Sequence, residues 1–140
     1  MEAVRSRRHA LRALGAFAAL PFVPTIALAR ARPRVVVIGA GYGGATAARY
    51  LALWGEGGVD VTLVERDAAF VSCPLSNLVL GGSRTLRDIT VDYGRIARRV
   101  RVVHDSAIAV DAQRRRVRLA RGDDLHYDRL ILSPGIDFFF

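Results

Sequence analysis

Three glycines with the spacing Gly39-x-Gly41-x-x-Gly44 are the residues whose arrangement most clearly predicts chemistry in this chain. They follow an apolar run and precede a segment rich in helix formers, which is the placement that a dinucleotide-binding turn requires. Gly39 permits a tight turn, Gly41 lets the backbone approach a pyrophosphate, and Gly44 lets the helix pack closely against the strand. The N-terminus of that helix offers free N–H groups and a partial positive charge to the phosphates.

An acidic residue ends the next apolar run, about 20 residues after the last glycine, as this motif also requires. The carboxylate of Glu65 is expected to accept hydrogen bonds from both ribose hydroxyls of an adenosine, and its charge argues against the extra phosphate of NADP. Arg66 either reaches the adenosine or faces water. A glycine-rich turn that binds no ligand is the alternative, and the combination of strand, glycines, helix, strand and terminal acid disfavours it.

FAD and NAD both use this motif, and two features favour FAD. The motif stands at the start of the chain that follows a predicted export signal. The later run "LILSPG" resembles the second FAD motif of flavoproteins that bind two dinucleotides. In that resemblance Ser133, Pro134 and Gly135 pass near the pyrophosphate. Ala107, in the segment Asp105-Ser106-Ala107, passes near the adenine.

Cys73 is the only cysteine of the chain. The eight-residue step from Glu65 to Cys73 spans up to about 26–29 Å when fully extended, enough to lead from the ribose to the flavin ring of an extended FAD. A thiol in that position attacks an active-site disulfide or bonds covalently to the flavin. The alternative is a small inert side chain, the usual role of a free cysteine.

The elements that position these residues follow from the apolar pattern. The run after Arg32 predicts a parallel strand that is buried on both faces. Residues Ala45 to Trp54 predict a helix, which the glycines of Gly55–Gly58 end. Val59 to Glu65 predicts the second strand, and the three elements form a right-handed βαβ unit.

The second half of the chain predicts an irregular loop followed mainly by short strands. We expect the loop, which holds a helical turn, from Arg66 to Thr90, and a short helix from Val91 to Arg99. Strands are expected in "VRVVHD", "AIAVDA", "RVRLA" and "DRLILSPG", with a hairpin around residues 112–115. The fold class is therefore α/β, a Rossmann-like domain with a small antiparallel β meander.

The N-terminus has the features of a targeting segment. The pair Arg7-Arg8 precedes a short apolar stretch that ends in Ala27-Leu28-Ala29, a site with small residues where a signal peptidase cleaves. The pair resembles a twin-arginine export signal, with Ala10 where that signal usually has Phe. We expect residues 1–29 to be this signal, residues 30–140 to be the mature chain in the periplasm, and the apolar stretch to be too short and mild for stable membrane insertion. An uncleaved anchor is the alternative.

The net charge of +8 does not indicate a nucleic-acid partner. All 21 basic residues are arginine, several lie in the predicted signal, and no aromatic-rich basic motif accompanies them. No cluster of His, Cys and carboxylates has the spacing of a metal site. His104 and His126 are expected at a strand end and a turn.

Four segments together resemble a known family: "RVVVIGAGYGGATAARYLAL", "VTLVE", "SCPLSNLVLGG" and "VVHDSA" are similar to the flavoprotein subunit of flavocytochrome c sulfide dehydrogenase. The resemblance implies a glutathione-reductase-like flavoprotein fold. It also implies FAD held through a thioether from Cys73 to the flavin 8α-methyl group. The implied reaction oxidises sulfide to sulfur or polysulfide and passes the electrons to a c-type cytochrome subunit.

Members of that family are longer and carry a redox pair of cysteines further along the chain. This chain has no second cysteine, so we expect residues 30–140 to correspond to the N-terminal part of a pyridine nucleotide-disulfide oxidoreductase-like domain, incomplete at its C-terminus. We therefore expect the cofactor-binding residues in this chain and no catalytic residue. The enzymatic alternative is a sulfide:quinone or NADH:quinone oxidoreductase with noncovalent flavin. The alternative from another class is a nucleotide-binding assembly module without flavin chemistry.

Overall fold

The structure is a computed structural model that describes residues 31–136. The predicted export signal, residues 1–29, lies outside the described residues, as do residues 137–140.

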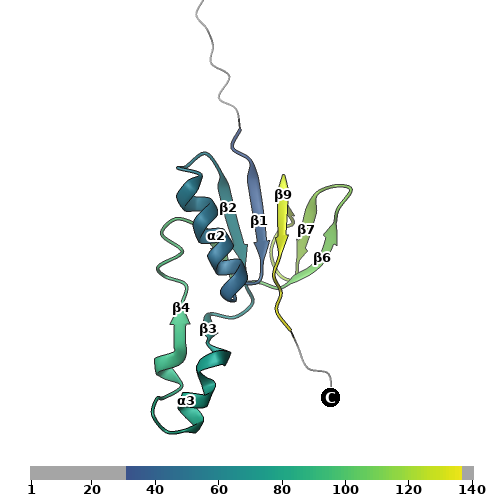
Figure 1. Ribbon diagram of the computed structural model, residues 1–140. Coiled ribbons are helices and arrows are strands. Elements are labelled where there is room, and N and C mark those ends of the chain that lie inside the picture. The colour runs from purple at the N-terminus through teal and green to yellow at the C-terminus, as the bar shows by residue number, and fades with distance from the viewer. Residues whose placement is uncertain (1–30, 137–140) are drawn as a thin grey trace, which may run out of the picture. The chain divides into compact units, whose positions relative to one another are not determined.

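A four-stranded parallel sheet forms the centre of the described chain (Figure 1). Its strands are β1 (Arg34–Ile38), β2 (Asp60–Val64), β5 (Arg101–Val103) and β9 (Arg129–Leu132), in the spatial order β5-β2-β1-β9. Helix α2 (Tyr42–Trp54) connects β1 to β2. The predicted βαβ unit is confirmed, although the helix begins at Tyr42 and not at Ala45. Of the motif's glycines, Gly44 lies in the first turn of α2, Gly41 is its N-cap and Gly39 precedes it.

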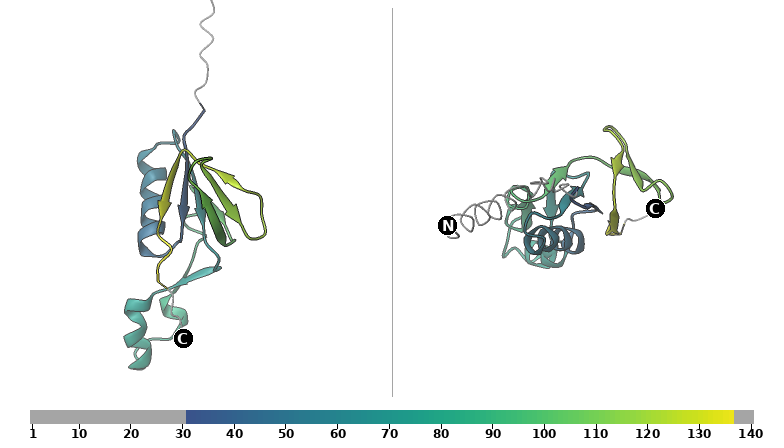
Figure 2. Two further views of the ribbon diagram at one scale, coloured as in Figure 1. Left: turned by 90° about the vertical axis from the view of Figure 1, so that its right-hand side faces the viewer. Right: turned by 90° about the horizontal axis from the view of Figure 1, so that it is seen from above.

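Different layers cover the two faces of the sheet (Figure 2). On one face, Val37 packs in a cluster with Ala48 of α2. On the opposite face, Val36 and Val64 pack with Val117 of the β meander. Val36 and Val37 pack into clusters on opposite faces because successive side chains of a strand point to opposite faces. The prediction from the continuous apolar run, a strand buried on both faces, is therefore confirmed.

The layer on the face of the sheet opposite to α2 is the predicted meander of three antiparallel strands. It consists of β6 (Ala107–Asp111), β7 (Arg116–Leu119) and β8 (Leu125–His126), in the order β6-β7-β8. The hairpin between β6 and β7 turns at residues 112–115, where Arg115 has a positive φ of 51°. The α/β fold with a small antiparallel meander is confirmed.

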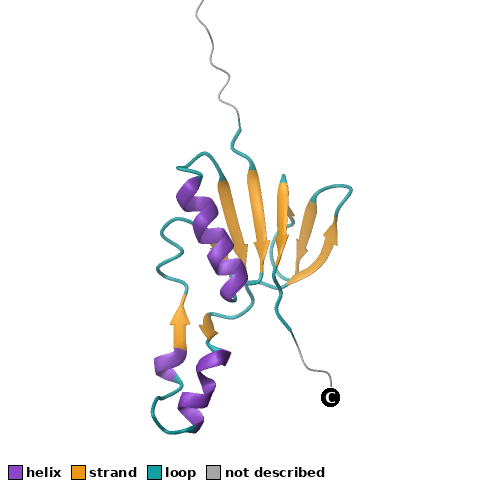
Figure 3. Cartoon of the chain, viewed as in Figure 1, coloured by secondary structure: helices purple, strands orange, loops and turns teal. Residues whose placement is uncertain are grey.

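Residues 69–92, called the arm below, lie beyond the carboxyl ends of the parallel strands (Figures 1 and 3). Its ends, β3 (Ala69–Val71) and β4 (Thr90–Asp92), pair in an antiparallel two-stranded sheet. Between them lie two 3₁₀ turns, η1 (Cys73–Leu75) and η2 (Arg87–Ile89), and the short helix α3 (Ser76–Leu80). The loop predicted over residues 66–90 is therefore more regular than its sequence indicated.

The short helix predicted from Val91 to Arg99 is wrong. Val91 pairs with Phe70 in the arm, so the segment starts as strand β4. The backbone N–H of Gly94 then donates to the Asp92 carboxylate at 2.7 Å, which begins a series of turns. Tertiary pairing has outweighed local helix propensity here.

Candidate dinucleotide-binding site

The residues that follow the parallel strands come together at one edge of the sheet. The ladder continues one residue past each strand: Gly39 N donates to Val64 O at 2.9 Å, and Ser133 N donates to Ile38 O at 2.8 Å. Glu65 N donates to Val103 O at 3.0 Å. Ligands of open α/β sheets bind outside the carboxyl ends of the strands. Gly39, Glu65 and Ser133, which were selected from distant segments, therefore occupy that position together.

Two glycines of the motif are required by the packing of the chain itself. Gly39 has a φ of +89°, and a Cβ on it would stand 2.1 Å from the carbonyl oxygen of Ser133. A Cβ on Gly44 would stand 1.8 Å from the carbonyl oxygen of Gly39. Both contacts are with backbone atoms, which cannot move aside like the end of a flexible side chain. The turn and the close approach of helix to strand thus need glycine at both positions.

Gly41 differs from the other two glycines because the chain leaves its Cβ position open. The nearest atom is a ring carbon of Phe70 at 3.9 Å, and the φ of −68° suits any residue. Gly41 is also the N-cap of α2, so no side chain caps the first-turn N–H groups. An open approach to uncapped N–H groups at a helix N-terminus fits a pyrophosphate. The geometry therefore agrees with the role predicted for Gly41.

Glu65 lies beside the glycine turn, and backbone donors hold its carboxylate. Its Oε2 accepts from the N–H of Ala40 at 2.7 Å, and its Oε1 accepts from the N–H of Asp67 at 3.1 Å. Each carboxylate oxygen keeps a second lone pair for a ribose hydroxyl. Glu65 therefore fits the predicted ribose contact and also fixes the turn itself.

Arg66 is exposed on the surface. Its Nε lies 3.7 Å from a carboxylate oxygen of Asp67, and both side chains are largely in solvent. Exposed ion pairs of this kind contribute little to stability. The Arg66 side chain faces water in this structure, and its contact with the adenosine stays a prediction.

The segment predicted near the adenine has a structural task. The Asp105 carboxylate is buried and accepts hydrogen bonds from the N–H groups of Ser106, Arg121 and Gly122 at 2.7 to 3.0 Å. Burial alone would raise the pKa of Asp105, but these backbone donors and the charge of Arg121 outweigh it and lower the pKa below its usual value. Ala107 is half-buried and packs with the cluster beneath the meander.

The Ser133-Pro134-Gly135 turn follows β9 directly against the glycine motif. The Ser133 hydroxyl lies 2.9 Å from the position that a Cβ of Gly43 would take. Gly135 has a φ of +79°, and its Cβ position is open. The turn thus lies beside the glycine motif, and its contact with the pyrophosphate stays a prediction.

Cys73 begins the η1 turn of the arm, and its side chain is exposed. Its carbonyl oxygen accepts from the hydroxyl of Ser76 at 2.7 Å. The preceding residue, Ser72, is buried and contacts Tyr42 at the start of α2. Cys73 therefore directly follows, in sequence, the residue through which the arm contacts the start of α2.

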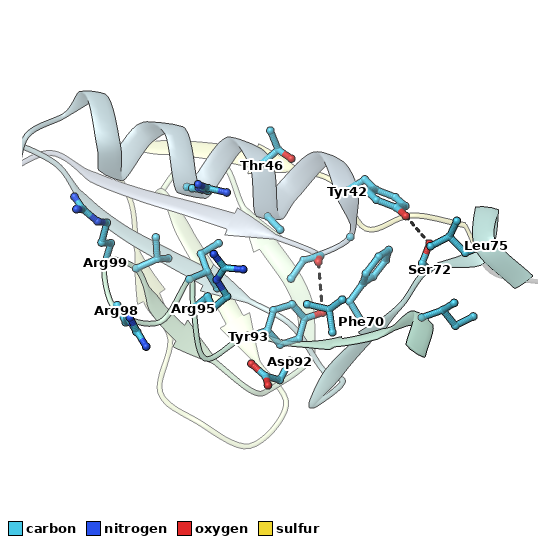
Figure 4. Close-up of a pocket in the computed structure, with 18 of the residues that line it drawn as sticks. Tyr42, Thr46, Phe70, Ser72, Leu75, Asp92, Tyr93, Arg95, Arg98 and Arg99 are labelled. Atoms are coloured by element: carbon cyan, nitrogen blue, oxygen red, sulfur yellow. Dashed lines mark hydrogen bonds between the residues drawn. The ribbon is translucent and has the colours of Figure 1, made fainter. Parts of the chain in front are cut away.

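A cavity of about 640 Å³ lies between α2 and the segment formed by the arm and the turns after it (Figure 4). Gly41 and Tyr42 line one end, Phe70 and Tyr93 contribute aromatic rings, and Arg99 lies toward the other end. The volume is typical of a small-molecule site. Sequence reasoning missed Tyr42, Phe70 and Tyr93, because their approach to the turn depends on contacts between distant segments.

Tyr93 is buried close to the glycine turn. Its hydroxyl donates to the carbonyl oxygen of Ala40 at 3.4 Å, and its ring centroid lies 5.9 Å from that of His104. Burial, together with the negative charges of Glu65 and Asp67, raises the pKa of Tyr93 to about 12.

Within residues 31–136, no three His, Cys, Asp or Glu side chains are grouped as a metal site would require. His104 directly follows β5 and has Nδ1 3.2 Å from the carbonyl oxygen of Asp67, and His126 is exposed in β8. The helices of the same residues include none with the length and apolar character to span a membrane.

Known proteins share both the sequence and the fold. Residues 33–138 match the family model of pyridine nucleotide-disulphide oxidoreductases. The sulfide dehydrogenase [flavocytochrome c] flavoprotein chain of Chlorobaculum thiosulfatiphilum is 54% identical over 46 residues, which are 33% of this chain and 94% of that sequence. Ferroptosis suppressor protein 1 of Taeniopygia guttata is 38% identical over 108 residues, 74% of this chain and 27% of that protein.

The fold is also similar to that of a solved structure. The sulfide:quinone oxidoreductase of Aquifex aeolicus superposes with a TM-score of 0.68 and 27% identity, over 77% of this chain and 25% of that one. The chain thus spans about a quarter of the length of that enzyme. The resemblance to the flavocytochrome c sulfide dehydrogenase flavoprotein and the Rossmann-like FAD-binding fold are confirmed. The chain belongs to the pyridine nucleotide-disulphide oxidoreductase family, whose members are FAD-dependent oxidoreductases.

Proposed function

We propose that the chain is the FAD-binding N-terminal portion of an enzyme that oxidises sulfide to sulfur or polysulfide and passes the electrons to a c-type cytochrome subunit. The observation that carries this proposal is the 54% identity to a sulfide dehydrogenase flavoprotein chain over a segment of 46 residues. Bound FAD would supply the acceptor for the two electrons of sulfide.

The residues of this chain fit the task of holding FAD. Gly41 and the N-terminus of α2 receive the pyrophosphate, because the Cβ position of Gly41 is open and the N–H groups are uncapped. Glu65 accepts hydrogen bonds from the ribose, and Ser133 closes the turn from the β9 side. The cofactor-binding residues proposed from the sequence also include Gly39, Gly44 and Gly135.

A thioether between Cys73 and the flavin 8α-methyl group is part of the proposal. The exposed thiol stands on the arm, one residue after the buried contact with α2, which supports it. Attachment removes one hydrogen from the thiol and one from the methyl group. As the C–S bond forms, the two electrons pass to the electron acceptor of the enzyme and the two protons pass to water.

The link is tested by acid precipitation of the full-length native protein, followed by mass spectrometry of its peptides. We expect a yellow pellet and a Cys73 peptide heavier by one FAD. Complete release of FAD into the supernatant, with Cys73 unmodified, contradicts the covalent link and leaves the noncovalent site in place.

A second candidate is electron delivery to a quinone. The superposition with a sulfide:quinone oxidoreductase at a TM-score of 0.68 favours it. The two candidates separate in one assay, in which the native protein receives sulfide with either oxidised cytochrome c or a soluble quinone. We expect cytochrome c to be reduced faster. Reduction of quinone alone overturns the cytochrome proposal, and a protein that contains no flavin overturns both and supports the assembly module.

Export to the periplasm by a twin-arginine signal also belongs to the proposal, on the basis of Arg7, Arg8 and the Ala27-Leu28-Ala29 site. N-terminal sequencing of periplasmic protein is expected to begin at Arg30. Replacing both Arg7 and Arg8 with Lys is expected to hold the precursor inside the cell. A cytoplasmic protein that keeps Met1 contradicts export.

A further inference from the structure

A hydrogen bond joins the first residue of α2 to the arm. The hydroxyl groups of Tyr42 and Ser72 lie 2.5 Å apart (Figure 4). The Tyr42 ring also meets the ring of Phe70 edge to face, with centroids 4.8 Å apart. Ser72 is only 4% exposed, whereas Tyr42 is 57% exposed. The hydrogen bond therefore joins a buried hydroxyl of the arm, on Ser72, to an exposed tyrosine at the start of α2.

Each end of this contact is attached to a different part of the cofactor site. Tyr42 directly follows Gly41, the N-cap at which a pyrophosphate fits. Ser72 directly precedes Cys73, and its own N–H donates to the carbonyl oxygen of Ile89 at 2.9 Å. A movement of the arm at Ser72 therefore either breaks the bond to Tyr42 or displaces the first turn of α2.

We propose that Tyr42 and Ser72 form a latch that couples FAD binding at the glycine turn to the placement of the arm that carries Cys73. In this role Tyr42 is a positioning residue, which acts on FAD through the arm and the first turn of α2. The inference rests on the proposed FAD site and holds with or without a covalent link to Cys73.

The size of the expected effect follows from the chemistry of the contact. Tyr42→Phe keeps the aromatic ring against Phe70 and removes only the hydroxyl. The buried hydroxyl of Ser72 then loses its partner, and a typical net hydrogen bond of about 1 kcal/mol corresponds to about a fivefold change in an equilibrium. Coupling is reciprocal, so the same bond that lets FAD steady the arm lets the arm retain FAD.

The chain offers a matched control for this substitution. Tyr50 lies on the same helix, and its ring packs against Trp54 with centroids 4.7 Å apart in a tilted arrangement, whereas Tyr42 meets Phe70 edge to face. Tyr50→Phe therefore removes a hydroxyl from a stacked tyrosine of α2 that lies away from the arm. Any general effect of losing such a hydroxyl appears in both variants.

The first measurement is hydrogen–deuterium exchange of the peptide around Ser72 in the full-length protein with Cys73→Ser, with and without FAD. We expect Tyr42→Phe and Ser72→Ala each to speed exchange about fivefold in the FAD-free protein, and the double variant to add little more. FAD is expected to slow this exchange less in Tyr42→Phe than in wild type. Tyr50→Phe is expected to match wild type.

The second measurement is the rate of FAD release in a Cys73→Ser background, where no thioether retains the flavin. We expect Tyr42→Phe to release FAD about fivefold faster, with Tyr50→Phe unchanged. Equal exchange and equal release in the two tyrosine variants overturn the latch. A wild-type protein that binds no FAD contradicts the proposed function instead, so the two failures are distinguishable.

Discussion

The backbone N–H of Ala40 donates a hydrogen bond of 2.7 Å to Oε2 of Glu65, which ties the glycine turn to the end of β2. The other carboxylate oxygen accepts from the N–H of Asp67 at 3.1 Å, so one side chain connects the turns that follow β1 and β2. Glu65 therefore shapes the site before a ribose arrives. A group that is already held in place loses little further freedom when a ligand binds, which favours affinity.

Glu65→Gln is expected to weaken FAD binding about 10- to 100-fold, because hydrogen bonds to a charged acceptor contribute about 1.5–3 kcal/mol. The amide has only one acceptor oxygen, so it cannot serve both backbone donors and a ribose. Fluorescence titration with FAD in the Cys73→Ser background measures the change. Glu56→Gln, at an exposed position in the turn after α2, is the control. Equal affinities in the two variants would show that Glu65 does not contact the cofactor.

Alanine at different glycines is expected to separate folding from binding. Gly39→Ala and Gly44→Ala bring a Cβ within 2.1 and 1.8 Å of backbone oxygens, and each should lower the free energy of unfolding by about 2–4 kcal/mol. Gly41→Ala brings a Cβ no closer than 3.9 Å to a ring carbon of Phe70, an ordinary contact, and should change stability by less than about 0.5 kcal/mol. It should still weaken FAD binding by about tenfold or more. Urea unfolding and FAD titration give the two quantities, and unchanged FAD affinity in Gly41→Ala would refute the pyrophosphate position.

The parallel sheet and the glycine site were predictable because their signals are local. A continuous apolar run around Val36 specifies a buried strand, and Gly39, Gly41 and Gly44 specify the turn through their spacing alone. Because neighbouring strands of a parallel sheet run in the same direction, their carboxyl ends lie at the same edge. No long-range information was needed to place Glu65 at the same edge.

The arm and its contacts were not predictable for the opposite reason. Val91 belongs to a strand because Phe70, far away in the sequence, pairs with it, and Tyr42 contributes through a hydroxyl that bonds to Ser72 of the arm. The segment from Asp105 to Ala107 stays a predicted neighbour of the adenine, but the sequence did not reveal that three backbone N–H groups donate to the Asp105 carboxylate. Contacts of this kind carry no spacing or periodicity that one sequence reveals.

Asp105→Asn is expected to remove part of the loss of stability in acid. The folded chain lowers the pKa of Asp105, so the stability that this carboxylate contributes is present above its usual pKa. It is lost as the pH falls below about 4 and through the lowered pKa. Urea unfolding between pH 3 and pH 7 should therefore show a weaker pH dependence in Asp105→Asn than in wild type. Asp123→Asn, at an exposed neighbouring position, should follow wild type, and parallel curves for Asp105→Asn would contradict the anchoring role.

Tyr93→Phe is expected to remove part of the loss of stability in alkali. The pKa of Tyr93 is raised to about 12, mainly by burial and further by the charges of Glu65 and Asp67, so the folded state favours the neutral phenol. The contribution of this group is present below the usual tyrosine pKa of about 10 and is lost as the pH rises from 10 toward 12. Urea unfolding at intervals from pH 8 to pH 11 should show wild type losing stability faster than Tyr93→Phe above pH 10. Tyr50→Phe, in which an exposed phenol is lost, should follow wild type. If all three proteins lose stability in parallel, the folded chain does not raise the pKa of Tyr93 through burial and the neighbouring carboxylates.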